Sequence, residues 1–314
     1  MNTVLLNMVH LDGAPIIKKG SGGGSTGGGG STAPGTKWTG HADAEGLKAI
    51  GWTDEDIAYY QEHGVNWNAE DDEYHKVTDD NKALYGVLTV YNIQTYKDRI
   101  VYLPKIDTSN VKDMSYKFYA CDGLKAIPMI DTSKVTDMGN MFTYCYTLTC
   151  IPPLDTSNVL YMSNMFNTCY SLAFVPPLDT KNVQSMTNMF YQCYSLSSIY
   201  FSDTSKVTNM SGIISKCPKI TSLPPFNAKD VSFYVSNFEY CYSLINIKLK
   251  NLSSNLILKN SKFLSKESLL YLINNEAATS AITITLESNA YERLANDADI
   301  VAALANHPNI SIAQ

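Results

Sequence analysis

The second half of this 314-residue chain carries a 24-residue repeat that keeps its register through six copies. An Asp-Thr pair marks the first five copies, and Asn227-Ala228 takes its place in the sixth. The five pairs begin at Asp107, Asp131, Asp155, Asp179 and Asp203. Because one copy has too few apolar residues to close a core alone, we expect the copies to stack and bury each other's faces. The sequence therefore predicts an α/β solenoid, which suits display better than a deep pocket.

Cysteine follows the same period. Six of the seven cysteines occupy one position of the repeat: Cys121, Cys145, Cys169, Cys193, Cys217 and Cys241. Cys150 lies outside the series. One cysteine per turn at an apolar position predicts a ladder of buried, reduced thiols, which indicates folding in a reducing compartment. Disulfides between adjacent turns are the alternative, and they would leave one thiol over.

The second copy shows what one turn contains. Its apolar residues recur at spacings of three and four: Val135, Met138, Met141, Phe142 and Cys145. This spacing predicts one core-facing side of a short helical stretch. Pro152-Pro153 then stops any helix, so we expect a short extended segment and a turn. Asp155 and Thr156 suit that turn because their side-chain oxygens can accept hydrogen bonds from nearby backbone N–H groups.

The consensus Asp-Thr-Ser-x-Val-Thr-x-Met-x-x-Met-Phe-x-x-Cys resembles the BspA-like leucine-rich repeats from about Leu103 to Leu244. The resemblance implies a leucine-rich-repeat solenoid with turns of 24 residues. Three copies depart from the consensus, with Lys117 in the first, Ile213-Ile214 in the fifth, and Tyr234 and Asn237 in the sixth. We expect these copies to pack less regularly.

The end of the chain, residues 251–314, resembles the helix-strand cap of many such proteins. Ser265 and Ser268 open an apolar stretch that predicts a helix to Asn275. The alternating stretch 281–286 predicts a half-buried strand, and 291–304 a closing helix. We therefore expect a helix-strand-helix cap.

The front of the chain divides into three parts: residues 1–19, 20–35 and 36–76, ahead of the repeats at 77–250. Residues 20–32 are a Gly/Ser/Thr-rich flexible linker, native or left by a fusion. We interpret residues 1–19 as an anchor peptide that folds onto a larger assembly. Its apolar residues are Val4, Leu5, Leu6, Ile16 and Ile17.

Residues 36–76 predict a small helical module. Stretches 43–50 and 53–63 read as helices, the second opened by Thr53 and three acidic residues. We expect the module to cap the first turn or to mediate oligomerisation. The stretch from Leu47 to Trp67 resembles modules in fibre proteins of crAss-like bacteriophages.

Tyrosine follows the periodic cysteine in four copies, while Asp122 and Pro218 take its place in the other two. These tyrosines are Tyr146, Tyr170, Tyr194 and Tyr242. Next to an inward cysteine this position points sideways or outward, so we expect a stacked ladder. The ladder could support packing, or it could form a contact surface for glycan or protein. Asn140, Asn164 and Asn188 also repeat, which we interpret as an internal amide ladder.

Charge and motif content argue against other functions. Net charge is −6 without a basic block, so neither nucleic acid nor an anionic membrane is an expected partner. All five histidines lie outside the repeats, and no phosphate loop, dinucleotide fingerprint or nucleophile elbow occurs. The repeated Asp carboxylates could bind calcium, but hydrogen bonds from backbone N–H groups of the turns can stabilise them without a metal. We expect no catalytic, cofactor-binding or metal-binding residues, and no enzyme activity.

Three functions remain open. The first is a phage virion fibre of the head or tail, assembled in the host cytoplasm. It would bind other virion proteins through residues 1–19, form a homo-oligomer and contact a host-surface glycan or protein. The second is a bacterial surface adhesin, and the third an intracellular interaction scaffold. The first is favoured because Met1 to Gly20 lacks the basic start of a signal peptide.

Overall fold

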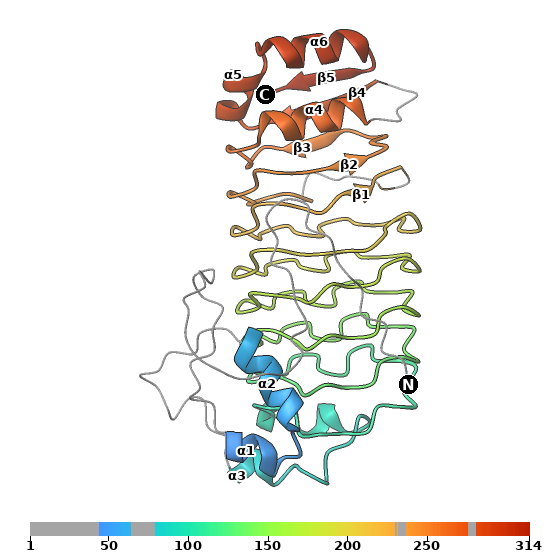
Figure 1. The fold of residues 1–314 in the computed structure, drawn as a ribbon, viewed down its shortest axis with the longest axis vertical. Coiled ribbons are helices and arrows are strands. Elements are labelled where there is room, and N and C mark those ends of the chain that lie inside the picture. The colour runs from blue at the N-terminus through green and yellow to red at the C-terminus, as the bar shows by residue number, and fades with distance from the viewer. Residues whose placement is uncertain (1–43, 64–78, 230, 232–236, 276–280) are drawn as a thin grey trace, which may run out of the picture. The chain divides into compact units, whose positions relative to one another are not determined.

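The computed structural model describes residues 44–63, 79–229, 231, 237–275 and 281–314. The predicted anchor and linker lie outside these residues. Counted from each Asp-Thr position, copy 1 begins at Asp107 and copy 6 at Asn227. The copies form successive turns that lie one above another, in chain order, between an N-terminal helical part and a C-terminal part with helices and strands (Figure 1).

Backbone hydrogen bonds join each turn to the next. The amide of Met138 donates to Tyr161 at 2.9 Å, and the amide of Met162 donates to Ser185 at 3.0 Å. Parallel bridges with the same period pair Asp137 with Tyr161 and Tyr161 with Ser185. The predicted register is therefore confirmed, and the chain has a repeat fold. Up to residue 225 the described backbone pairs through isolated bridges rather than through longer strands.

The helical stretch predicted inside each turn is wrong, because two consecutive four-residue turns produce the same spacing. In copy 2 the amide of Met141 donates to Met138 at 3.2 Å, and that of Cys145 to Phe142 at 3.0 Å. The amides of Phe142 and Tyr144 donate instead to the next copy, to Met165 at 2.8 Å and to Asn167 at 3.0 Å. Successive four-residue turns bring a side chain into the core every three or four residues, which is the same spacing that a helix produces.

Each of these turns needs one residue with positive φ. Asn140, Asn164 and Asn188 fill this position with φ of 58°, 57° and 51°, and Gly212 fills it in copy 5 with φ of 66°. Asparagine and glycine tolerate this conformation better than other residues. Backbone conformation therefore explains why asparagine or glycine recurs at this position. The expected amide ladder between copies stays a prediction.

Phenylalanine rings stack at the centre of the core. Phe118 lies 5.1 Å from Phe142, and the next two centroid distances, to Phe166 and then Phe190, are both 5.5 Å, with ring planes within 6°. Four thiols of the cysteine ladder donate to a Phe carbonyl of the preceding copy, as Cys145 does to Phe118 at 3.0 Å, and Cys241 donates to Ile214 O at 3.1 Å. All seven cysteines are buried and none forms a disulfide, as predicted for reduced core thiols.

The departures from the consensus have unequal effects. Copy 1 stacks as regularly as its neighbours despite Lys117, so the expectation of looser packing is wrong there. In copy 5 Ile214 ends the ring stack, and Phe190 packs against Phe201 at 6.2 Å. In copy 6 Asn237 is fully buried, and its Nδ2 has no hydrogen-bond partner in the described part of the chain.

The N-terminal helices are α1 (Ala44–Ala49) and α2 (Asp54–His63), where the sequence predicted them. Thr53 and Asp56 form a reciprocal cap, since the Asp56 amide donates to Thr53 Oγ1 at 3.1 Å and the Thr53 amide donates to Asp56 Oδ2 at 2.8 Å. Helix α3 (Asp79–Lys82) and the 3₁₀ helices η1 (Ile93–Thr95) and η2 (Lys97–Arg99) lead into the first repeat.

The helical module packs along the side of the first turns rather than over their end. Trp52 Nε1 donates to Leu103 O at 2.8 Å, Tyr60 Oη to Ile127 O at 2.8 Å, and Tyr59 Oη to Ile151 O at 3.0 Å. These three carbonyl groups lie one repeat apart, and each precedes a proline. The end of the core is closed by the stretch 84–93, whose buried residues are Leu84, Leu88, Val90 and Ile93.

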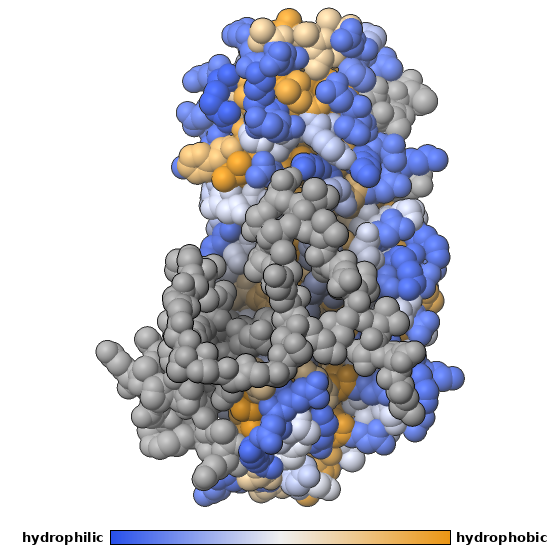
Figure 2. All heavy atoms as spheres, in the orientation of Figure 1, coloured by the Kyte–Doolittle hydropathy of each residue, from blue (hydrophilic) through white to orange (hydrophobic). Residues whose placement is uncertain are grey.

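The C-terminal part contains regular strands. β1 (Phe226–Asn227) pairs with β2 (Leu249–Lys250), while β3 (Leu256–Leu258), β4 (Ile282–Leu286) and β5 (Ile310–Ala313) form a parallel sheet in that order. β4 alternates buried and half-buried residues as predicted. Hydrophilic side chains cover most of the visible C-terminal part, and apolar ones gather at its outer end (Figure 2).

The helices of this part confirm one prediction and correct another. Helix α4 (Lys266–Asn274) begins after Ser265, whose side chain accepts from the Ser268 amide as expected. The predicted single closing helix is two helices, α5 (Ser288–Leu294) and α6 (Ala298–Asn306). Asp297 starts the second by accepting from the Asp299 and Ile300 amides, and β5 follows where no strand was predicted.

Candidate contact surface

Three of the four predicted tyrosines form a stacked ladder. The rings of Tyr146 and Tyr170 lie 5.1 Å apart at 23°, and those of Tyr170 and Tyr194 lie 5.0 Å apart at 12°. Each follows its cysteine as the second residue of a four-residue turn, in which Leu148 donates to Cys145 in copy 2. Because successive turns are hydrogen-bonded in register, the distance between neighbouring rings follows the distance between neighbouring turns.

The fourth predicted tyrosine is separate from this ladder. Pro218 takes the tyrosine position of copy 5, so Tyr242 has no neighbouring rung below it. It packs instead against Tyr240, at 5.9 Å and 68°. Tyr242 remains 46% exposed.

The ladder continues towards the N-terminal end through three tyrosines that sequence reasoning missed. Tyr116 contacts Tyr119 at 5.5 Å, Tyr119 contacts Tyr144 at 5.4 Å, and Tyr144 contacts Tyr146 at 6.1 Å. We call the resulting chain of rings the aromatic strip: Tyr116, Tyr119, Tyr144, Tyr146, Tyr170 and Tyr194. It crosses four successive copies.

A positive-φ backbone places two of the missed tyrosines on the surface. Tyr116 has φ of 58° and Tyr144 has φ of 64°, the positions that asparagine or threonine fill in other copies. Tyr116 is 53% exposed and Tyr144 37%. A bulky residue at such a position is uncommon, and this was the available sequence signal. It was missed because Tyr116 does not recur with the repeat, and Tyr144 recurs only at Tyr240, four copies later.

Beyond the strip, a lysine lies between two more aromatic rings. Lys216 Nζ donates to Tyr191 Oη at 2.9 Å, and it lies 5.1 Å from the Tyr191 ring centroid and 5.9 Å from that of Tyr240. The hydrogen bond to Tyr191 raises the pKa of Lys216, so the ammonium group stays charged at neutral pH. Within the strip, partial burial and then the Asp122 carboxylate raise the pKa of Tyr146.

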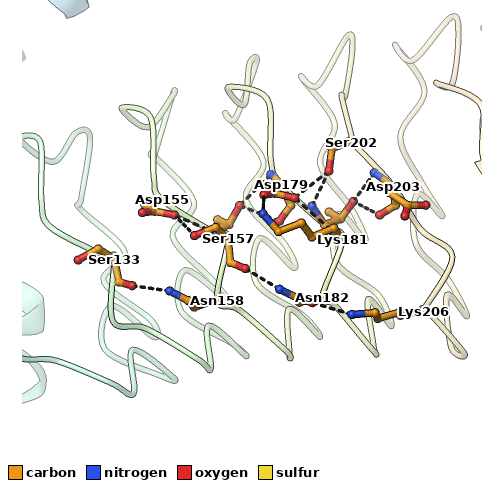
Figure 3. Close-up of polar contacts among 12 residues, drawn as sticks. Ser133, Asp155, Ser157, Asn158, Asp179, Lys181, Asn182, Ser202, Asp203 and Lys206 are labelled. Atoms are coloured by element: carbon orange, nitrogen blue, oxygen red, sulfur yellow. Dashed lines mark hydrogen bonds and ion pairs between the residues drawn. The ribbon is translucent and has the colours of Figure 1, made fainter. Parts of the chain in front are cut away.

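The Asp-Thr turns form a different polar edge, which is shown in Figure 3. Asp155 Oδ1 accepts from the amide and hydroxyl of Ser157 at 3.0 and 2.6 Å. Thr156 reaches the next copy rather than its own turn, because its Oγ1 accepts from the Asp179 amide at 2.8 Å and donates to the Asp179 carbonyl at 3.0 Å. The threonine part of the turn prediction therefore needs this correction.

Side-chain ladders continue along the same edge. Asn158 Nδ2 donates to Ser133 O, and Asn182 Nδ2 to Ser157 O, both at 2.8 Å. Lys206 Nζ donates to Asn182 Oδ1 at 2.7 Å (Figure 3). These polar side chains therefore hydrogen-bond to neighbouring turns of the stack. In the described part of the chain, no three His, Cys, Asp or Glu side chains gather as metal ligands would.

The predicted anchoring residues Val4, Leu5, Leu6, Ile16 and Ile17 lie outside the described residues. Within 44–63, 79–229, 231, 237–275 and 281–314, no helix is both long and apolar enough to cross a membrane.

The fold and the strip define a repeat protein with a periodic side-chain surface, and a sequence comparison identifies its family. The family described as "Mycoplasma protein of unknown function, DUF285" matches residues 89–174, 112–227 and 172–268. The matches together span 89–268, or 180 of 314 residues, so the chain belongs to this family. It is a family of BspA-like repeats, which agrees with the predicted repeat class. No curated protein matches the sequence.

Proposed function

We propose that this chain is a non-enzymatic structural and recognition protein, a virion fibre of the head or tail of a phage. Its repeats form a leucine-rich-repeat solenoid with 24 residues per turn. Residues 1–19 anchor it to other virion proteins, and the aromatic strip contacts the host surface.

The observation that carries this proposal is the aromatic strip on a hydrogen-bonded stack. Tyr170 and Tyr194 are 37% and 40% exposed although their rings stack on each other. Tyrosine provides a large contact area with a polar hydroxyl and loses little conformational entropy on binding. Contiguous exposed aromatic surface of this kind is typical of binding sites. The stack holds the rings in fixed positions before any partner arrives, which lowers the entropic cost of contact.

The thiol chemistry supports a non-enzymatic role. Burial raises the pKa of Cys121 to about 12, and it raises the pKa values of Cys145 and Cys169 well above the ordinary range. A thiol must ionise to act as a nucleophile. The repeated cysteines are therefore core residues, buried in the same hydrophobic cluster as the phenylalanine rings.

Support for a virion fibre comes from the N-terminal half. The stretch from Leu47 to Trp67 resembles modules of crAss-like phage fibres, and its described part is held to three successive turns by Trp52, Tyr59 and Tyr60. The module and the repeats thus move together. A flexible linker ahead of them would let residues 1–19 dock independently.

The test compares the full chain with a version that begins at Ala33. Light scattering gives the mass of each, and sedimentation with phage particles that lack the protein measures capture. We expect a homo-oligomer whose capture requires residues 1–19. In parallel, replacement of Tyr146, Tyr170 and Tyr194 by serine should abolish binding to host cells and leave capture by particles intact. Capture that does not depend on residues 1–19 would contradict the fibre.

A bacterial surface adhesin is the second candidate, because the family description names a bacterium, Mycoplasma. A protein that ignores phage particles but binds other cells or their matrix through the same tyrosines would support the adhesin.

A further inference from the structure

The tyrosine ladder lacks one rung, at Pro218. Tyr194 stacks on Tyr170 at 5.0 Å through one ring face, and within the described residues no ring contact joins Tyr194 to Tyr242. Two turns separate these two tyrosines, which corresponds to about 10 Å. Proline has no aromatic ring, so the rung position between Tyr194 and Tyr242 holds only the half-buried Pro218. We call this position the notch.

A cation lies beside this notch. Lys216 precedes Pro218 by two residues, and no carboxylate of the described residues lies within 4.0 Å of its ammonium group. Glu239 acts on it only from a greater distance. On the Asp-Thr edge, Lys181 Nζ forms a 2.7 Å ion pair with Asp179, whereas Lys206 Nζ donates to the neutral Asn182 Oδ1 at 2.7 Å. The charge of Lys216 is therefore available to an anionic group that enters the notch.

The backbone around the notch favours a glycan over a peptide. Extended peptides usually add to an edge with unpaired N–H and C=O groups. Here the Gln192 amide donates to Ser215 O at 3.0 Å, and the Lys216 amide donates to Glu239 O at 2.7 Å. Side chains alone are offered: two ring faces, phenolic hydroxyls and an ammonium group. A sugar ring with an acidic substituent complements all of these, since its C–H face packs on aromatic rings and its anion pairs with lysine.

We infer that the notch between Tyr194 and Tyr242 binds one acidic sugar unit of a host-surface glycan. The sugar ring lies between the two tyrosine rings above Pro218, and its carboxylate or sulfate pairs with Lys216. This inference rests on the proposed recognition function and names its ligand class.

The test uses the full chain and a panel of polymers: polygalacturonate, hyaluronate, polysialic acid and heparin as acidic probes, and dextran as the neutral one. Calorimetry should show binding to at least one acidic polymer, weakening with salt, and none to dextran. Pro218→Tyr fills the missing rung, and four copies already carry tyrosine there, so the variant should fold normally and bind at least tenfold more weakly. Lys216→Gln should weaken binding similarly, whereas Lys206→Gln on the Asp-Thr edge should not.

Two results would overturn the inference: no binding to any acidic polymer, or binding that Pro218→Tyr leaves unchanged while circular dichroism shows a normal fold. Host-cell binding separates this failure from that of the proposed function. Cell binding that requires Tyr170 but survives Pro218→Tyr removes the acidic-sugar site and leaves the recognition function standing.

Discussion

The hydroxyl of Tyr60 donates a 2.8 Å hydrogen bond to the carbonyl of Ile127, 67 residues further along the chain. That carbonyl precedes a proline, as do the carbonyls held by Trp52 and Tyr59. Proline has no N–H to offer the neighbouring turn, so each repeat leaves backbone groups near this position without a ladder partner. The helical module supplies donors to three of these carbonyls.

Removal of the Tyr60 hydroxyl should destabilise the first turns. Tyr60→Phe keeps the fully buried ring but leaves the Ile127 carbonyl without its donor, which costs about 1–3 kcal/mol of unfolding free energy. Urea unfolding measures the change. Tyr59→Phe is the matched control, because its hydrogen bond is only partly buried and should contribute less. Equal losses in both variants would contradict this account.

Because Asn164 has positive φ, alanine at this position should destabilise the fold more than glycine does. Both substitutions remove the 3.0 Å hydrogen bond from Asn167 Nδ2, but only alanine also meets the strain of φ at 57°. Asn164→Ala should therefore be less stable than Asn164→Gly by about 1 kcal/mol. Thermal unfolding of the two variants side by side gives the difference. A more stable alanine variant would rule out the conformational explanation.

Acid should weaken the contact between the module and the repeats through Asp56. Burial raises the pKa of this carboxyl, but hydrogen bonds from Thr53 and Met129 lower it, and the net pKa lies below the usual value. A folded pKa below the unfolded one, which is about 4, gives stability that is present above pH 4 and is lost as pH falls through the folded pKa.

Unfolding in urea at pH 7 and at pH 3 measures this dependence. The unfolding free energy of the native chain should fall more between the two values than that of Asp56→Asn. Asp54→Asn, which changes a carboxylate that is 87% exposed, should keep the native dependence. The same pH dependence in all three proteins would exclude a role for Asp56.

The thiol ladder should resist alkylation and disulfide exchange. Burial raises the pKa values of Cys121 and Cys241 to about 12, so almost no thiolate exists at pH 8. A coloured disulfide reagent should label none of the seven cysteines in the native protein and all seven in denaturant. Rapid labelling of the native protein, with free cysteine as the reagent control, would show that the ladder is open.

The sequence predicted those features of the fold that depend on period alone. Stacking in register, the inward cysteines and the rung tyrosines of copies 2 to 4 all follow from a repeat without insertions. Ser265 and the strand after it could be predicted because a cap and an alternating pattern are local signals. The stretch from Met138 to Cys145 was misread because four-residue turns and a helix bring residues inward at nearly the same spacing.

Features that depend on contacts between distant segments had no such signal. Tyr116 and Tyr144 join the strip through positive-φ positions, and neither recurs in an adjacent copy. The hydrogen bonds from the helical module to the carbonyls before proline could not be predicted, because the sequence does not show which backbone groups of the stack lack a partner. β5 was not predicted because its pairing with β4 depends on the path of the chain through α5 and α6.

The unbroken hydrogen-bonded register has a consequence for how such a chain can change. Between copies, the backbone of a turn pairs with the turns directly above and below it, as the amides of Phe142 and Phe166 do with the next copies. Removing or duplicating one whole repeat therefore restores every bond at the new junction. The length of the surface can be adjusted in steps of one ring, and a missing rung such as Pro218 can be moved along it by shuffling copies rather than by redesigning the fold.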